Sequence, residues 1–334
     1  MAKMRVLGVV VMLTVGAAVL AAGGVLAQDE EPVLLQYKFI PDCTVNYEVT
    51  GNGTMPMSLS TGPEGGNQTI AMDMSMDMRI GIKETCAELL EDGNGKMLMT
   101  LPLMVVQVST AIADQAVDAL VTWENNVLAV TVNGQALPGD QNAQQLETLL
   151  RNPIKLTMTP TGAAKLEEET LQLLGDMANN PMGGFSYSLN SLTGGLSPEP
   201  VKAGDVWQVT ITGEETHGMM EGSGECKFAG FEAIDGIRCA RIEGEAQVKS
   251  LKPLPNFSVG GAGQGEVTAL EMSITFVNYF DPEAGHMVLS TMDMTQNMTM
   301  MVTVGGQGGA QAMQLPASIE NGQMHMEMRY KSVE

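Results

Sequence analysis

The sequence is poor in basic and aromatic residues. Its 334 residues include 17 lysines and arginines against 39 aspartates and glutamates, which gives a formal net charge of −22, and only 4% of the residues are aromatic. A surface this acidic repels nucleic acid and anionic lipid headgroups. No basic stripe with interleaved aromatic residues occurs in the sequence. The composition therefore argues against nucleic acid and anionic membranes as partners.

Motifs that carry catalysis or bind metal ions are also missing. The three histidines, His217, His286 and His325, are far apart, and no HExxH, zinc-spaced Cys/His cluster or EF-hand pattern occurs. There is no Gly-x-Ser-x-Gly elbow, and the glycine-rich stretches lack the Lys-Ser/Thr pair that completes a phosphate-binding loop. No pair of acid/base carboxylates stands out. We therefore expect a protein that is not an enzyme and that uses no cofactor.

Cysteine is scarce as well. The four cysteines are Cys43, Cys86, Cys226 and Cys239. CxxC spacing does not occur, which argues against a redox motif or a zinc knuckle. In an exported protein four cysteines permit two disulfides in three connectivities. Cys226 and Cys239 flank an Asp235-Gly236 turn, and a tight turn would place Cys239 opposite Glu232. A Cys226–Cys239 disulfide, which we consider here, therefore requires a longer loop or a bulge.

The N-terminus carries the pattern of an export signal. Lys3 and Arg5 precede a long uncharged run that ends in small residues at Ala27, and acidic residues follow at once. This pattern predicts a signal peptide over residues 1–27. The alternative is a retained membrane anchor, because the uncharged run is long enough to span a bilayer. We expect an exported protein, periplasmic or extracellular, with no stable membrane insertion after cleavage.

Methionine, by contrast, is abundant, with 28 residues. Three stretches place methionine at every second position, which is the period of a β-strand, whose side chains point alternately to its two faces. Each stretch therefore predicts a strand with one thioether face and one polar face. These methionines are Met72, Met74, Met76 and Met78; Met292, Met294, Met298 and Met300; and Met324, Met326 and Met328.

Glycine and asparagine mark turns between the expected strands. Asp92-Gly93-Asn94-Gly95 predicts a hairpin between strands at 69–85 and 96–110. Gly51-Asn52-Gly53 predicts a break in the first β segment.

The recurring alternating segments predict a mainly β protein with a large antiparallel sheet, strongly curved or shaped as a half-barrel. Helical periodicity over about 141–151 and 165–177 predicts one or two short helices. We expect a single large β domain over residues 28–334. An alternative organisation has two pseudo-repeats, 33–160 and 200–334, joined by a helical and Gly/Pro-rich segment.

Three short elements carry a resemblance to known proteins. They are Tyr37-Lys38-Phe39, the Gly-Asp-x-Trp element within 200–207, and the Tyr-Phe-Asp-Pro-x-x-Gly element at 279–285. Their arrangement resembles an uncharacterised family of bacterial exported β-rich proteins, which is similar in general build to periplasmic half-barrel lipoprotein carriers. The resemblance implies an apolar concavity that binds acyl chains, and it implies no catalytic residue.

Three interpretations fit the methionine pattern. Methionine could replace other apolar residues in the packed core of a structural or interaction protein of the cell envelope. It could instead line an adaptable concavity for a hydrophobic small molecule or lipid, because its side chain is flexible and polarisable. The third interpretation is a Cu(I) site at Met324, His325 and Met326, since thioethers are soft ligands. On a regular strand His325 faces away from both methionines, so this site requires a bulge or a second strand. Binding of a hydrophobic ligand is our working hypothesis.

Overall fold

A computed structural model describes most of the chain. The described residues are 31–60, 69–112, 115–136, 141–174, 195–211, 220–259, 263–304 and 313–334. The expected signal peptide, 1–27, lies outside them, as do the end of the expected helix 165–177 and much of the Gly/Pro-rich segment. Leu34–Glu334 forms one compact unit, and the fold below is that of this unit.

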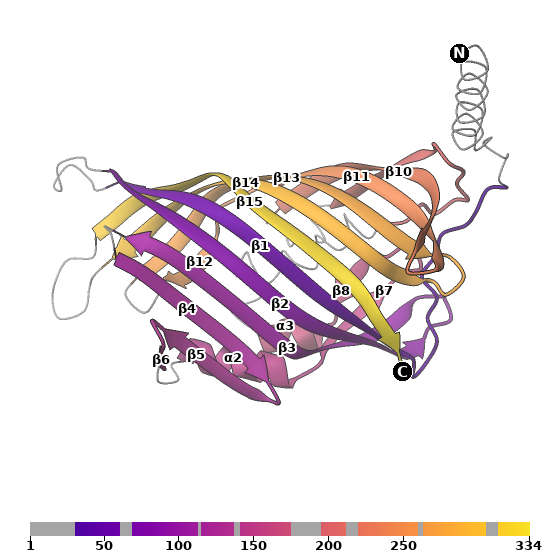
Figure 1. Cartoon of the computed structure of the whole chain (residues 1–334), viewed down its shortest axis with the longest axis horizontal. Helices are drawn as coiled ribbons and strands as arrows, with labels where there is room; N and C mark the ends of the chain where they lie inside the picture. Colours follow the sequence, from indigo (N-terminus) through magenta and orange to yellow (C-terminus); the bar gives the residue numbers. More distant parts are fainter. Residues whose placement is uncertain are drawn as a thin grey trace, which may run out of the picture. The chain divides into compact units, whose positions relative to one another are not determined.

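The described residues form one antiparallel sheet of fifteen strands, which Figure 1 shows as long, strongly twisted ribbons side by side. The predicted mainly β fold is therefore confirmed. The strands are β1 (Thr44–Ser60), β2 (Thr69–Leu89), β3 (Gly95–Ile112), β4 (Gln115–Glu124), β5 (Val127–Val132), β6 (Gln135–Ala136), β7 (Ile154–Met158), β8 (Ala164–Leu166), β9 (Val206–Ile211), β10 (Met220–Ile234), β11 (Ile237–Ser250), β12 (Leu254–Val259), β13 (Gly263–Asp281), β14 (His286–Val304) and β15 (Met313–Val333).

The order of the strands in the sheet follows the chain except at two junctions, β1–β15 and β13–β11. The path runs β6-β5-β4-β3-β2-β1-β15-β14-β13-β11-β10-β9, so β1 lies between β2 and the C-terminal strand β15. Among the described residues the path ends at β6 and at β9, so that the sheet is open there. β7 pairs with β3 and β8, and β12 pairs with β13. The described residues also form two short helices, α2 (Gln141–Arg151) and α3 (Glu168–Leu174). They match the predicted helical segments, except that α3 starts later because 164–166 is a strand.

Two-residue turns with left-handed backbone explain several hairpins. Asn125-Asn126, Asn133-Gly134 and Asp235-Gly236 all have positive φ angles, between 50° and 86°. Asparagine, aspartate and glycine tolerate this conformation, which matches the twist of the paired strands. The Asp235-Gly236 turn pairs Glu232 with Cys239, as the sequence predicted.

The predicted break at Gly51-Asn52-Gly53 is wrong, because β1 passes through all three residues in register with both neighbours. Their pairing partners explain why the strand continues: Asn52 lies between Asp77 and His325, and the two glycines lie between methionines of β2 and β15. Strand pairing on both sides therefore outweighs the local turn signal.

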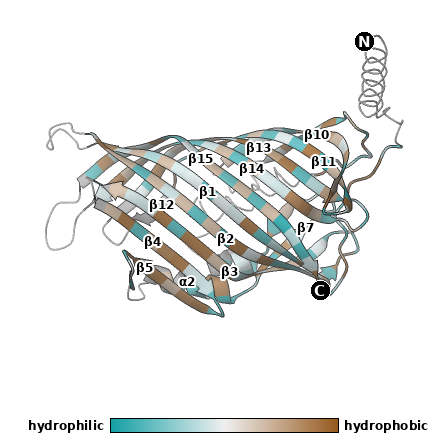
Figure 2. Ribbon diagram, in the orientation of Figure 1, coloured by the Kyte–Doolittle hydropathy of each residue, from teal (hydrophilic) through white to brown (hydrophobic). Residues whose placement is uncertain are grey.

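Side chains of opposite character occupy the two faces of the sheet, and Figure 2 shows hydrophobic and hydrophilic residues alternating along the strands. One face, here called the methionine face, contains the paired row Phe276, Met292, Met326, Gly51, Met78 and Val106 from β13 to β3. The opposite face, the polar face, contains the neighbouring row Thr275, Asp293, His325, Asn52, Asp77 and Gln107.

Two buried clusters on the methionine face lie toward the opposite ends of β2. The first, near the end of β2, consists of Phe39, Cys86, Met97, Met99, Ile154 and Leu156. The second, near the start of β2, consists of Met55, Met300, Val302, Ala317 and Ile319. Burial of such side chains stabilises the fold by about 25 cal/mol per Å² of apolar area removed from water.

The Cys226–Cys239 disulfide that we considered does not form, since all four thiols are free. Cys226 pairs with Gly244, five residues along β11 from Cys239. Five residues of strand span roughly 16 Å, whereas the Cα atoms of a disulfide lie within about 7 Å of each other. The tight turn therefore keeps the two thiols apart.

Candidate functional site

The eleven alternating methionines lie on the face that the sequence predicted for them. On β2, Met72 to Met78 alternate with exposed Asp73, Ser75 and Asp77, and the runs on β14 and β15 belong to the same face. Cross-strand pairs join them, for example Met292 with Met326 and Met294 with Met324. The structure therefore gathers thioethers from β2, β14 and β15 into one surface around β1.

Exposure divides these methionines into two groups. Met72, Met294 and Met300 are buried, with 9%, 5% and 6% of their surface exposed. The other eight are partly exposed. They are Met74, Met76, Met78, Met292, Met298, Met324, Met326 and Met328. A fully packed core would bury all eleven, so part of the methionine face is accessible.

β1 contributes residues to this surface that the sequence analysis missed. Met55 pairs with Met74, and Met57 pairs with Met72. These two methionines also alternate in the sequence, separated by a proline, so the signal was present but short.

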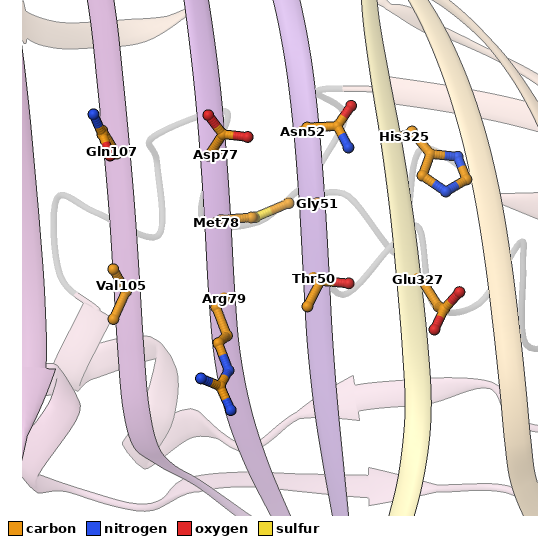
Figure 3. Close-up of a pocket in the computed structure, with 10 residues that line it drawn as sticks. All are labelled: Thr50, Gly51, Asn52, Asp77, Met78, Arg79, Val105, Gln107, His325 and Glu327. Atoms are coloured by element: carbon orange, nitrogen blue, oxygen red, sulfur yellow. The ribbon is translucent and has the colours of Figure 1, made fainter.

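Gly51 on β1 leaves space that neighbouring side chains fill. A Cβ atom there would lie 2.6 Å from Cε of Met78 and 3.1 Å from Cγ of Met326. Figure 3 shows Met78 extending from β2 across to Gly51.

A single carboxylate interrupts the methionine face on β2. Glu84 continues the row of alternate residues after Met78, Ile80 and Ile82, and it pairs with Val45 on β1 and Met99 on β3. Burial among these side chains disfavours the charged carboxylate and raises its pKa to about 7. Among the described residues, no lysine, arginine or histidine forms an ion pair with it.

Two tyrosines, Tyr37 and Tyr47, lie near enough to this carboxylate to interact with its charge. Burial raises the pKa of Tyr37 and Tyr47 well above the usual range, and the nearby charge of Glu84 raises both further. Tyr330 pairs with Tyr47 across the β1–β15 ladder, and the ring of His286 lies 4.7 Å from that of Tyr330. The Glu84 end of the face therefore combines one carboxylate with neutral hydrogen-bonding groups inside apolar surroundings.

Two hollows described by the structure lie on the polar face. The larger, of about 660 Å³, extends over β2, β1, β15 and β14, and eight of its twelve lining residues are polar. The smaller, of about 410 Å³, is the one in Figure 3, with Asn52, Asp77, Gln107 and His325 around it. These linings suit water or polar groups better than an acyl chain. Neither hollow is a cavity lined mainly by methionine.

The predicted Cu(I) site at Met324, His325 and Met326 is wrong. β15 pairs regularly with β1 and β14 at these positions, without a bulge. His325 therefore lies on the polar face, where its Nδ1 atom is 2.8 Å from Oδ1 of Asp293, and the two methionines lie on the opposite face. The imidazole and the thioethers do not converge on one point.

The described residues offer neither a cluster of metal ligands nor a membrane-spanning helix. They contain no cluster of three or more His, Cys, Asp or Glu side chains that could hold a metal ion. Within the same residues, no helix combines the length and the apolar character needed to cross a membrane.

Solved structures of outer membrane channels show a distant similarity to this chain. No protein-family model and no curated protein sequence matches the chain. An outer membrane channel from Pseudomonas putida F1 aligns over 92% of this chain and 100% of its own, with 8% identity and a TM-score of 0.23. OpdQ from Pseudomonas aeruginosa aligns over 87% and 99%, with 6% identity and a TM-score of 0.15. The CymD monoaromatic hydrocarbon channel aligns over 87% and 89%, with 8% identity and a TM-score of 0.11. Similarities at this level do not assign a family or a function.

Proposed function

We propose that this protein binds a hydrophobic small molecule or a lipid acyl chain along its methionine face and catalyses no reaction. The N-terminal signal pattern supports an exported protein of the periplasm or the cell exterior. The methionine face supports a binding role, and the resemblance to exported β-rich proteins agrees with it. The family membership itself stays a prediction.

The partial exposure of eight thioether side chains is the observation that carries this proposal. Contiguous apolar surface that stays in contact with water is unfavourable, and such surfaces commonly mark sites of interaction. Methionine suits such a site because its unbranched, polarisable side chain adapts to ligands of different shape. The two buried clusters anchor the face at its ends, so the accessible region lies between rigid supports.

A packed structural core is the competing function. It is favoured by Met72, Met294 and Met300, which are buried as firmly as ordinary core residues. In that case the partly exposed methionines would be peripheral to the core, and the protein would show no saturable binding of apolar probes.

Binding of a fluorescent acyl-chain probe separates the two functions. We predict saturable binding to the full-length protein, with affinity reduced about tenfold in Met78→Gln, because loss of one apolar contact of this size costs about 1.5 kcal/mol. Asp77→Asn is the matched control, since Asp77 is the preceding residue and lies on the polar face.

Thermal unfolding of both variants shows whether they fold. Equal loss of affinity in Asp77→Asn, or no saturable binding by the unmodified protein, would contradict the proposal.

A further inference from the structure

Very few charged side chains lie on the methionine face. Alternate positions of β1, β2, β14 and β15 face this side of the sheet, and register shifts after Cys86 on β2 and between Ile319 and Gly322 on β15 change which positions these are. Because of these shifts Glu88 and Glu320 do not continue the methionine rows. In the described parts of these strands Glu84 is then the one charged side chain on this side. Aspartates and glutamates elsewhere on these strands, such as Asp73, Asp77 and Asp293, alternate onto the polar face and are exposed.

Glu84 also lies in line with the proposed binding surface. Between Met78 and Glu84 the same side of β2 presents only Ile80 and Ile82. Six residues of strand span roughly 20 Å, which is the scale of an extended acyl chain. An apolar track therefore leads from the methionines to the carboxylate.

A carboxylate among apolar side chains is costly unless it is paired or hydrogen-bonded. The structure gives Glu84 no basic partner in the described residues, while Tyr37 and Tyr47 lie close enough to interact electrostatically with it. A positively charged ligand group would supply the missing partner, and the two phenols could hydrogen-bond to it.

We propose that the Glu84 end of the methionine face binds the ammonium head of a cationic amphiphile, a primary alkylamine whose chain lies along the methionines. This inference rests on the proposed function and narrows its ligand class. An anionic fatty acid is disfavoured at this site because its carboxylate would meet Glu84 and an overall charge of −22. A neutral alcohol could bind along the chain but would leave Glu84 unpaired.

The pH dependence of binding follows from the same geometry. Three elements pack around Glu84: Tyr37 faces it from the N-terminal segment and Tyr47 from β1, while Met99 on β3 carries no charge. Both phenols and the nearby Cys86 thiol stay neutral near pH 7 because burial raises their pKa. His286, whose ring lies against Tyr330 at the same end of the face, is also neutral there, because burial lowers its pKa. Glu84, whose pKa is about 7, is then the group that titrates. Affinity for an alkylamine should rise from about pH 6 to about pH 8, as the carboxylate ionises.

Three ligands with the same twelve-carbon chain test the inference: dodecylamine, dodecanol and dodecanoate, each below its micelle-forming concentration. Each competes with the fluorescent probe on the full-length protein. We expect dodecylamine to bind about tenfold more tightly than the other two, and Glu84→Gln to remove this advantage without changing dodecanol binding. Glu245→Gln is the control, because Glu245 is exposed on β11.

The outcomes distinguish the inference from the function on which it rests. Equal binding of all three ligands, or an amine preference that survives in Glu84→Gln, would overturn the ammonium site and leave the hydrophobic-ligand function standing. If the fluorescent probe does not bind and none of the three ligands binds, both the ammonium site and the hydrophobic-ligand function are overturned. Retained dodecanol binding by Glu84→Gln shows that the variant is folded.

Discussion

At the scale of single residues, Glu84 is the position where an ionisable side chain lies in apolar surroundings. Its neighbours on the same side of β2 are Ile82 and Cys86, and its partners across the sheet are Val45 and Met99. A carboxylic acid in this place is more stable protonated than ionised. The residue therefore lowers the stability of the unliganded protein wherever it must carry its charge.

Glu84→Gln should change how stability depends on pH. The pKa of Glu84 is about 7 in the folded state and 4.5 in the unfolded state. Between these two pH values the folded protein therefore keeps a proton on Glu84 that the unfolded protein has lost. Stability contributed by this group is thus present at low pH and is lost as pH rises through about 7, by an amount on the order of 3 kcal/mol at most. The variant should be more stable than the unmodified protein above about pH 7 and similar to it near about pH 5.

Urea unfolding of the unliganded protein at a series of pH values measures this difference. Glu245→Gln serves again as the exposed control and should follow the unmodified protein throughout. Parallel pH profiles for Glu84→Gln and the unmodified protein would show that Glu84 ionises normally in the folded state.

Cys43 and Cys86 lie opposite each other where β1 begins. The amide of Cys86 donates to the carbonyl of Cys43 at 3.1 Å, and the amide of Asp42 donates to the carbonyl of Cys86 at 2.8 Å. Asp42 has a φ of 64°, so the pattern is that of a G1 bulge. Residues opposed in this way have Cα atoms about 5 Å apart, which lies within the range for a disulfide.

Oxidised glutathione should therefore cross-link Cys43 to Cys86 in preference to Cys226 and Cys239. In the exchange the two protein thiols are oxidised to a disulfide, and one glutathione disulfide is reduced to two thiols. Peptide mass mapping without reduction identifies the bond, and Cys43→Ser should abolish it. A Cys226–Cys239 bond, or four thiols that all survive oxidation, would contradict the register described above.

At the scale of elements, glycines allow large side chains to cross neighbouring strands. Gly244 on β11 pairs with Phe276 on β13, whose ring lies directly over it. A Cβ atom on Gly244 would come within 2.1 Å of Cζ of Phe276, and this ring is almost completely buried. The aromatic ring thus covers the strand at a position where only glycine fits.

Gly244→Ala should lower the free energy of unfolding by about 1–3 kcal/mol, because the ring must move within a packed region. The control is Gly81→Ala on β2, where the nearest atom, Cβ of Leu103, would lie at 3.3 Å. The urea concentrations at the midpoint of unfolding are compared between the variants, provided that the dependence of the unfolding free energy on urea concentration is unchanged. A similar loss in both variants would mean that backbone conformation, and not the Phe276 ring, sets the cost.

The sequence predicted some elements well because their signals are local. Period-two methionines identified the faces of β2, β14 and β15, and the Asp235-Gly236 turn fixed the register of β10 with β11. Gly51-Asn52-Gly53 misled because its turn signal competes with strand pairing on both sides, which sequence periodicity does not reveal. Glu84 could have been found, since it continues the alternation that begins at Met72.

At the scale of the whole sheet, the arrangement depends on contacts between distant parts of the chain. β1 pairs with β15, so residues near position 50 lie beside residues near position 325. Such pairing depends on long-range packing and cannot be read from a local pattern. For this reason the sequence could predict three separate methionine strands but not that β1 would join them into one continuous face.

The accessibility of that face is the central claim, and methionine methyl NMR tests it most directly. In protein labelled with ¹³C at the methionine methyl groups, a hydrophobic ligand should shift the signals of Met78, Met292 and Met326 saturably. The signals of Met220 and Met272, which are almost completely buried on β10 and β13, should stay in place. Unchanged signals from Met78, Met292 and Met326 at saturating ligand would contradict the account.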